Sequence, residues 1–169
     1  MDSQILRDAI SGDRDALSSL INKYKDIAFN LAISIVKNQE DAKDIIQESF
    51  LKVLENIHKF RNDSKFSTWL YKIVYNQSIG LVQKKGKMEF QDFSKDSIAH
   101  QMFETDIEID RYEALYNAID QLAEAEYTLI QLYYMAEKSI KDIHQITGMS
   151  VSNIKVSLHR ARKKLAEKL

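Results

Sequence analysis

The chain has 169 residues, a formal net charge of −1, four glycines, no proline and no cysteine. Because it has no cysteine, the chain can form neither a disulfide framework nor a thiolate metal site. The scarcity of glycine and proline argues against β-hairpins and β-sandwiches, which need many turn residues, so we predict an all-α fold. The N-terminus lacks a basic segment followed by an apolar run, and no stretch of about 18 apolar residues occurs, so we expect a cytoplasmic protein without membrane insertion.

The first half of the chain begins with apolar residues at helical spacing over residues 5–10 and 16–36. The second run carries an apolar stripe wide enough to pack on two neighbours, so we expect it to be scaffold. A break at Asn38 precedes a third helix, predicted over residues 41–58. Asp41 would open that helix, near the positive end of its dipole.

The helix predicted at 41–58 has two different sides. The residues that can face a core are Ile45, Ile46, Val53, Leu54 and Ile57. The other side mixes acidic, polar and apolar residues, namely Asp41, Asp44, Gln47, Glu48, Leu51 and Lys52. A solvated acidic face is the ordinary interpretation of such a pattern, and a surface that binds a basic, partly apolar partner is the alternative.

The charge reverses in the next segment, because residues 59–87 hold seven Lys or Arg against one Asp. Residues 60–65 have loop composition, and Ser67 can cap a helix that begins at Thr68. In that helix three aromatic residues alternate with basic and polar ones: Trp69, Tyr71, Lys72, Tyr75 and Asn76. Unstacked bases bind aromatic rings while cations hold the phosphates, so this pattern predicts a surface for melted DNA. The alternative is that the aromatic residues belong to the core.

A boundary is predicted after this helix. Residues 84–87 are basic and contain a glycine, and residues 89–126 then hold eleven acidic side chains against two basic ones. Acidic, weakly periodic sequence between two basic helical units is typical of an interdomain linker. We therefore predict two small helical domains, residues 1–84 and 111–169, joined by a flexible acidic linker over residues 85–110.

The C-terminal domain is predicted to end in a helix-turn-helix. Helices over residues 112–122 and 124–136 supply apolar faces for it to pack on. Ser139 and Asp142 have the spacing of a capping box, and Gly148 suits the left-handed exit of the short helix that follows. Ser150 can then cap a second helix.

That second helix has one apolar stripe and one basic, polar face. The stripe consists of Val151, Ile154, Leu158, Ala161 and Leu165. The opposite face and its flanks hold Ser152, Asn153, Lys155, Val156, His159, Arg160, Arg162 and Lys163. Residues 139–169 carry seven basic side chains against two acidic ones, which indicates phosphate binding by a helix that enters the major groove. A solvated helical hairpin is the alternative.

Three segments of the chain resemble the extracytoplasmic-function (ECF) group of bacterial sigma-70 family sigma factors. They are residues 41–51, DAKDIIQESFL, residues 60–73, FRNDSKFSTWLYKI, and residues 158–165, LHRARKKL. The segments occur in the family's order, and the middle one is the most specific. The resemblance implies that residues 1–84 form the family's region 2 and residues 111–169 its region 4.

The resemblance also implies a function in transcription initiation. Core RNA polymerase would bind the mixed side of the helix at 41–58 described above. The promoter −10 element would be contacted by Arg61, Asn62, Asp63, Ser64, Lys65, Trp69, Lys72, Tyr75 and Asn76. The −35 element would be read by the polar face of the second helix of the helix-turn-helix. An anti-sigma factor is a further implied partner, and no cofactor or metal is implied.

The residues leave three other classes of protein as alternatives. An enzyme is disfavoured because the four histidines are scattered without metal-ligand spacing and no Gly-rich phosphate loop occurs. The serious alternative is a helix-turn-helix repressor whose N-terminal half binds a ligand or dimerises, and which binds duplex operator alone. A protein-binding adaptor predicts no loss of DNA affinity when Arg160 or Arg162 is replaced.

Overall fold

The computed structural model describes residues 2–88, 118–119 and 121–168. Every regular element in these ranges is helical, which confirms the predicted all-α fold. The elements are α1 (Asp2–Ile10), α2 (Arg14–Val36), α3 (Gln39–Asn56), the 3-10 turn η1 (Ile57–Lys59), α4 (Phe66–Met88), α6 (Glu124–Ile130), the π-helical turn η2 (Gln131–Met135), α7 (Ile140–Thr147) and α8 (Val151–Ala166). Most of the linker predicted at 85–110, and most of the helix predicted at 112–122, lie outside the described residues.

The N-terminal helices begin at side-chain caps. The carboxylate of Asp13 accepts the backbone N–H of Asp15 at 2.8 Å, which starts α2. Lys37 ends that helix in the left-handed conformation with φ of 55°. The Asn38 side chain then accepts the N–H of Asp41 at 3.0 Å. Because Asn38 supplies the cap, α3 begins two residues before the predicted start, and Asp41 lies within its first turn.

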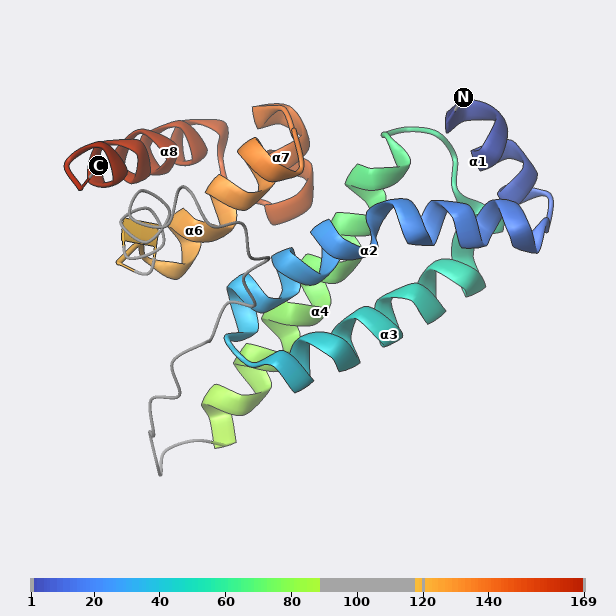
Figure 1. Cartoon of the computed structure of the whole chain (residues 1–169), viewed down its shortest axis with the longest axis horizontal. Coiled ribbons are helices and arrows are strands. Elements are labelled where there is room, and N and C mark those ends of the chain that lie inside the picture. Colours follow the sequence, from blue (N-terminus) through green and yellow to red (C-terminus); the bar gives the residue numbers. More distant parts are fainter. Residues whose placement is uncertain (1, 89–117, 120, 169) are drawn as a thin grey trace, which may run out of the picture.

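Helix α2 is the scaffold of the N-terminal half, as predicted. It packs against α1, α3 and α4 (Figure 1), with Leu31 and Ala28 fully buried on it. Val53 of α3 and Leu70 of α4 are fully buried as well. The prediction that Leu54 faces this core is wrong, because its side chain is 47% exposed on the outer side of α3.

Helix α4 is longer than predicted at both ends. It begins at Phe66, so Ser67 is not its cap but a buried residue of its first turn. It continues to Met88, so residues 84–87, which were predicted to be flexible, are helical. At 1.5 Å per residue the 23 residues of α4 form a rod of about 35 Å, which runs across the N-terminal half (Figure 1).

The C-terminal half forms a second group around α8. Leu129 of α6, Ile143 of α7 and Leu158 of α8 are all fully buried between these helices. Helix α6 widens into η2, where the Ala136 N–H donates to the carbonyl of Gln131, five residues back, at 2.9 Å. No helix within the described ranges is both long and apolar enough to span a membrane.

The two groups of helices touch. Helix α4 packs against α7 and α2 packs against α6, so the buried side chains of both halves form one continuous cluster (Figure 1). We call this contact the closed arrangement. No short-range pattern signals this contact, because it depends on residues more than 60 positions apart in the chain.

Candidate functional site

The predicted helix-turn-helix is confirmed by its caps. The Ser139 hydroxyl accepts the N–H of Asp142 at 3.1 Å, and the Asp142 carboxylate accepts the N–H of Ser139 at 3.2 Å. Gly148 ends α7 with φ of 73°. The Ser150 hydroxyl accepts the N–H of Asn153 at 3.2 Å, which starts α8. These bonds set the angle at which α8 leaves the turn.

Helix α8 presents the predicted polar face to solvent. Ile154, Leu158 and Ala161 are fully buried, whereas Val151 is 42% exposed and so does not belong to the buried stripe. All the side chains predicted to bind the −35 element are exposed: Ser152, Asn153, Lys155, Val156, His159, Arg160, Arg162 and Lys163. Arg162 lies at one edge of this face, with its guanidinium carbon 5.6 Å from the ring centre of Tyr133.

A partly buried ion pair ties α8 to α6. The Lys164 ammonium donates to the Glu126 carboxylate at 2.7 Å, and the backbone N–H of Ala123 donates to the same oxygen at 3.1 Å. Burial by itself raises the pKa of Glu126, but these two hydrogen bonds, together with the positive charges of Lys164 and Arg160, outweigh burial and hold the pKa below its ordinary value. Glu126 in its charged form therefore holds α8 against α6.

We expect Glu126→Gln to lower the free energy of unfolding by about 1–2 kcal/mol near neutral pH, because a charge-assisted bond is lost. A lowered pKa means that the stabilisation is complete above the ordinary carboxyl pKa and disappears as pH falls through the folded-state pKa. Urea denaturation at a series of pH values should show the two proteins converging in acid. The exposed neighbour Glu124→Gln is the control, and a difference that persists unchanged in acid would contradict the assignment.

The residues predicted to contact the −10 element fall into two groups. Arg61, Asn62, Asp63 and Lys65 are exposed and Ser64 is half-buried in the loop before α4, where Asn62 has a positive φ of 59°. Lys72 and Asn76 are exposed one turn apart on α4, so they share one face with each other. The loop and this face are open to solvent in the closed arrangement.

The aromatic residues of α4 are more buried than Lys72, Asn76 and the loop before the helix. Trp69 is half-buried, with its ring centre 5.2 Å from that of Phe60 and 5.9 Å from that of Phe66. Tyr71 is only 1% exposed, and its burial raises the pKa of its hydroxyl. Tyr71 is thus a core residue, as the alternative interpretation of the aromatic residues predicts.

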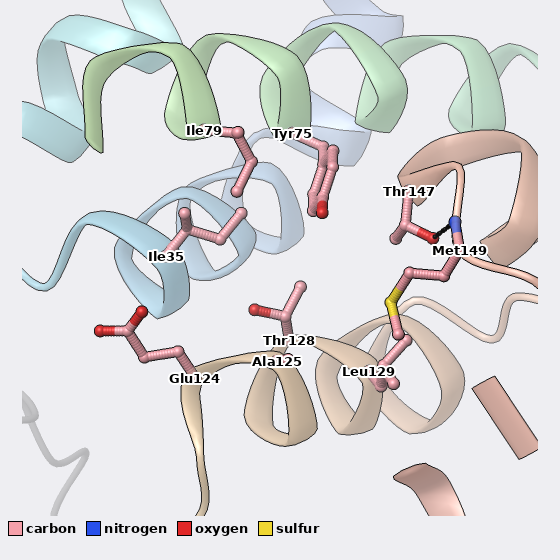
Figure 2. A pocket seen from close by; sticks show the side chains of 9 residues that line it. All are labelled: Ile35, Tyr75, Ile79, Glu124, Ala125, Thr128, Leu129, Thr147 and Met149. Carbon is pink, nitrogen blue, oxygen red and sulfur yellow. Dashed lines mark hydrogen bonds between the residues drawn. The ribbon is translucent and has the colours of Figure 1, made fainter. Parts of the chain in front are cut away.

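Tyr75 lies at a cavity between the two halves. The cavity has a volume of about 150 Å³ and is lined by Ile35, Tyr75, Ile79, Glu124, Ala125, Thr128, Leu129, Thr147 and Met149. Figure 2 shows the Tyr75 hydroxyl pointing from α4 into this space, towards Thr128 of α6. Burial raises the pKa of Tyr75 as well. In the closed arrangement Tyr75 therefore faces the other half of the chain.

The predicted partner surface on α3 is exposed and contains an additional apolar residue. Asp44, Gln47, Glu48, Leu51 and Lys52 are all exposed, and Asp41 is half-buried. Leu51 and Leu54 are 53% and 47% exposed three residues apart, so they share one side of α3. Leu54 was predicted to face the core, although its spacing of three residues from Leu51 was a signal for the exposed side.

Two members of this surface have partners on α4. Asp41 accepts from the Lys85 ammonium at 2.5 Å, and Glu48 accepts from the Gln77 amide at 3.1 Å. These contacts fix α3 against α4. Asp44 lies between these two anchored residues and Leu51 follows three residues after Glu48, so both exposed side chains are presented on a fixed helix.

The fold and these surfaces define a class of protein. The chain is all-helical, with a basic helix-turn-helix and a second exposed basic loop, which is the architecture of a DNA-binding transcription protein.

Comparison with known proteins identifies the family within this class. Residues 20–88 match Sigma-70 region 2, and residues 112–165 match Sigma-70 region 4. The chain is 33% identical to the RNA polymerase sigma factor SigV of Bacillus subtilis over 87% of both chains. It is 29% identical to the ECF RNA polymerase sigma factor SigW of the same organism, over 94% of this chain and 91% of the relative.

Solved structures share the fold. The sigma factor RpoE of Bartonella quintana, in complex with the anti-sigma factor NepR, has a TM-score of 0.75 at 21% identity and covers 89% of this chain and 94% of its own. CnrH, in complex with the cytosolic domain of CnrY, has a TM-score of 0.68 at 21% identity, with coverage of 98% and 95%. The chain belongs to the ECF group of the bacterial sigma-70 family.

Membership of this family confirms two further predictions. The chain is a sigma factor, which binds core RNA polymerase and directs promoter recognition and transcription initiation. It is a regulatory DNA-recognition protein of two sigma domains. The repressor alternative is not favoured.

Proposed function

We propose that the mixed side of α3 is the surface that binds core RNA polymerase. It consists of Asp41, Asp44, Gln47, Glu48, Leu51 and Lys52, to which we add Leu54. The exposure of two leucines among acidic residues supports this assignment, because an exposed apolar pair rimmed by charge suits a protein partner better than it suits water. The bonds from α4 to Asp41 and Glu48 keep the surface in place.

The −10 element is assigned to the loop before α4 and to α4 itself. The loop residues are Arg61, Asn62, Asp63, Ser64 and Lys65. The helix contributes the exposed Lys72 and Asn76 and the half-buried Trp69 and Tyr75. The exposed Lys72 and Asn76 suit the phosphate backbone, and the loop offers hydrogen-bonding groups for an unstacked base. Trp69 supports the loop through its contact with Phe60.

The −35 element is assigned to α8. The observation that carries this proposal is the exposed polar face of a capped second helix whose opposite side is fully buried. Such a helix can lie in the major groove with its N-terminal residues near base edges. Ser152, Asn153, Lys155, Val156 and His159 are therefore assigned to bases, and Arg160, Arg162 and Lys163 to phosphates.

Two substitutions on α8 separate phosphate contacts from base contacts. We expect Lys163→Ala to weaken binding to all duplexes alike and to reduce the salt slope by about 0.9, because one counterion fewer is released. Asn153→Ala should instead change the preferred sequence, with a loss of roughly 1–3 kcal/mol on the cognate site. Fluorescence anisotropy of the polymerase complex on promoter and scrambled duplexes at several salt concentrations distinguishes these effects. Equal losses on all sequences from both variants would reject base reading by α8.

The assignment of the three surfaces is tested by promoter-dependent transcription. Purified core polymerase and the full chain should give run-off transcripts from a promoter identified by mapping start sites after overexpression. Replacement of Asp44 by Lys should remove association with core, whereas replacement of Lys72 by Glu should leave association intact and remove open-complex formation. No defined transcript from the unmodified chain, in the absence of any inhibitory partner, would overturn the proposal.

We also propose that the chain acts in the cytoplasm, catalyses no reaction itself and is held inactive by an anti-sigma factor. The complex of RpoE with the anti-sigma factor NepR, which has the same fold, supports the last assignment. Affinity purification of the chain from uninduced and induced cells, followed by mass spectrometry, tests it. A single bound protein that is lost on induction is the expected result.

A further inference from the structure

The cavity into which Tyr75 points is enclosed by both groups of helices. Helices α2 and α4 form one wall, α6 forms the opposite wall, and the turn between α7 and α8 closes a third side (Figure 2). Of the described residues that line it, only Glu124 and Ala125 are exposed, and both lie at the start of α6. The cavity of about 150 Å³ therefore opens to solvent at this end of α6.

The deeper part of the cavity is mostly apolar. Leu129 is 0% exposed and Ile35 is 6% exposed, while Ile79 and Met149 are half-buried. Cavities of about this volume with an apolar lining can stay dry and bind benzene. The space therefore fits one six-membered ring with a small substituent.

Two of the three hydroxyl groups of the lining already have partners in the chain. The Thr147 hydroxyl donates to the carbonyl of Ile143 at 2.8 Å and accepts the N–H of Met149 at 3.2 Å. The Thr128 hydroxyl lies 3.3 Å from the hydroxyl of Ser34. An ordered water needs two to four polar partners, so this lining holds water poorly. Displacement of such water by an apolar ligand favours binding.

The third hydroxyl, that of Tyr75, is available to a ligand. It points into the cavity and has no hydrogen-bond partner among the described residues (Figure 2). Burial raises the pKa of this hydroxyl, so it keeps its proton at neutral pH and can donate a hydrogen bond. A ligand with one oxygen or nitrogen acceptor would satisfy it.

The lining favours a neutral aromatic ring over other apolar groups. The ring of Tyr75 can pair with a second aromatic ring, and the sulfur of Met149 makes favourable contacts with ring edges. The carboxylate of Glu124 at the mouth repels an anion. Size, apolar walls, one free donor and a negative mouth thus define one class of ligand.

We propose that this cavity binds a small, neutral aromatic molecule that carries one hydrogen-bonding group, of which phenol is the simplest example. The ring lies between Ile35 and Leu129, and its oxygen accepts a hydrogen bond from Tyr75. Neither the polymerase surface nor the DNA-binding face of α8 takes part, so the site goes beyond the function proposed above. The ligand contacts both groups of helices and raises the melting temperature of the chain by mass action.

The first test locates the ligand by NMR on the free, full chain. Labelling with carbon-13 at the methyl group of methionine gives signals for five residues, and Met149→Leu assigns the signal of Met149. Phenol should shift this signal saturably with a dissociation constant of about 1 mM or lower, which a ligand of so few atoms can reach. Met135, which is 60% exposed, is the control and should not shift. The absence of a saturable shift at Met149, or an equal shift at Met135, would overturn the proposal.

The second test removes the free donor. Tyr75→Phe keeps the ring, so we expect roughly three- to tenfold weaker binding of phenol and unchanged binding of benzene, because one hydrogen bond is lost. Tyr134→Phe removes a hydroxyl from a residue that is 50% exposed outside the cavity, and should alter neither affinity. Unchanged binding of phenol by Tyr75→Phe would overturn the proposed class of ligand.

The third test blocks the mouth. Ala125→Trp places a large side chain at an exposed position of the lining and should abolish the shift of Met149 by phenol. Gln121→Trp adds the same side chain at an exposed residue outside the lining and should keep binding. A CD spectrum of each variant checks that the helices are retained. Phenol binding that persists in a folded Ala125→Trp variant would overturn the proposed site.

The charge of the ligand is tested with the unmodified chain. Benzoate has the same ring as phenol but a negative charge, so it should bind at least tenfold more weakly than phenol. Equal affinity for both would contradict the assignment of a neutral ligand. All these measurements are made without polymerase or promoter DNA. Failure of run-off transcription would therefore overturn the proposed function alone, and absence of binding would overturn the ligand site alone.

Discussion

Replacement of Leu158 by alanine should lower the free energy of unfolding by about 3 kcal/mol, which is within the usual cost of removing a fully buried leucine. Leu158 is 0% exposed and lies on the side of α8 that packs against α6. Truncation leaves a cavity that this short helical group has few means to fill. A fall of roughly 6–12 °C in the melting temperature follows for a chain of this length.

The same helix provides the control for this prediction. Val156 is 43% exposed, so Val156→Ala should change the free energy of unfolding by no more than about 0.5 kcal/mol. Thermal denaturation followed by CD at 222 nm measures both variants. A loss below about 1 kcal/mol for Leu158→Ala would mean that α8 is not anchored by its buried stripe, and the rigid presentation of its polar face would then be unsupported.

The features that could be predicted from the sequence depend on short-range chemistry. The Ser139 capping box, the Gly148 exit and the Ser150 cap each require residues within four positions of one another, and all three occur where they were predicted. The buried stripe of α8 follows from helical periodicity for the same reason. Only Val151, in the first turn of α8, departs from the stripe, because its side chain is 42% exposed.

The features that could not be predicted depend on which helix lies opposite. Leu54 satisfies the periodicity of a core residue as well as that of the exposed side, and only the position of α2 and α4 decides between them. Ser67 has the composition of a cap, yet it bonds Lys138, a residue 71 positions away. No local pattern contains such a pairing, so the closed arrangement becomes visible only in the structure. The resemblance to the family predicted which residues contact polymerase and DNA. It did not predict how buried each of these residues is, because burial depends on the packing of the helices.

The largest expected effect on function arises at Leu54, which was wrongly predicted to face the core. We expect Leu54→Ser to weaken binding of the chain to core polymerase by roughly 10- to 100-fold, since burial of a leucine contributes about 1.5–3 kcal/mol and each 1.4 kcal/mol is tenfold in affinity. Leu54 is 47% exposed in the free chain, so the variant should keep its stability within about 0.5 kcal/mol. Loss of binding without loss of fold is therefore the expected signature.

Val82→Ser is the matched control for this experiment. Val82 is an apolar residue of α4 that is 38% exposed and lies outside the α3 surface, so its replacement should leave the affinity for core polymerase unchanged. Biolayer interferometry with immobilised core enzyme compares the two variants and the unmodified chain. Equal weakening by both would indicate a general effect of exposed apolar residues, and no weakening by Leu54→Ser would remove Leu54 from the polymerase surface. Selective weakening would show that the exposed leucine pair, and not the acidic charge alone, determines the affinity of α3 for its partner.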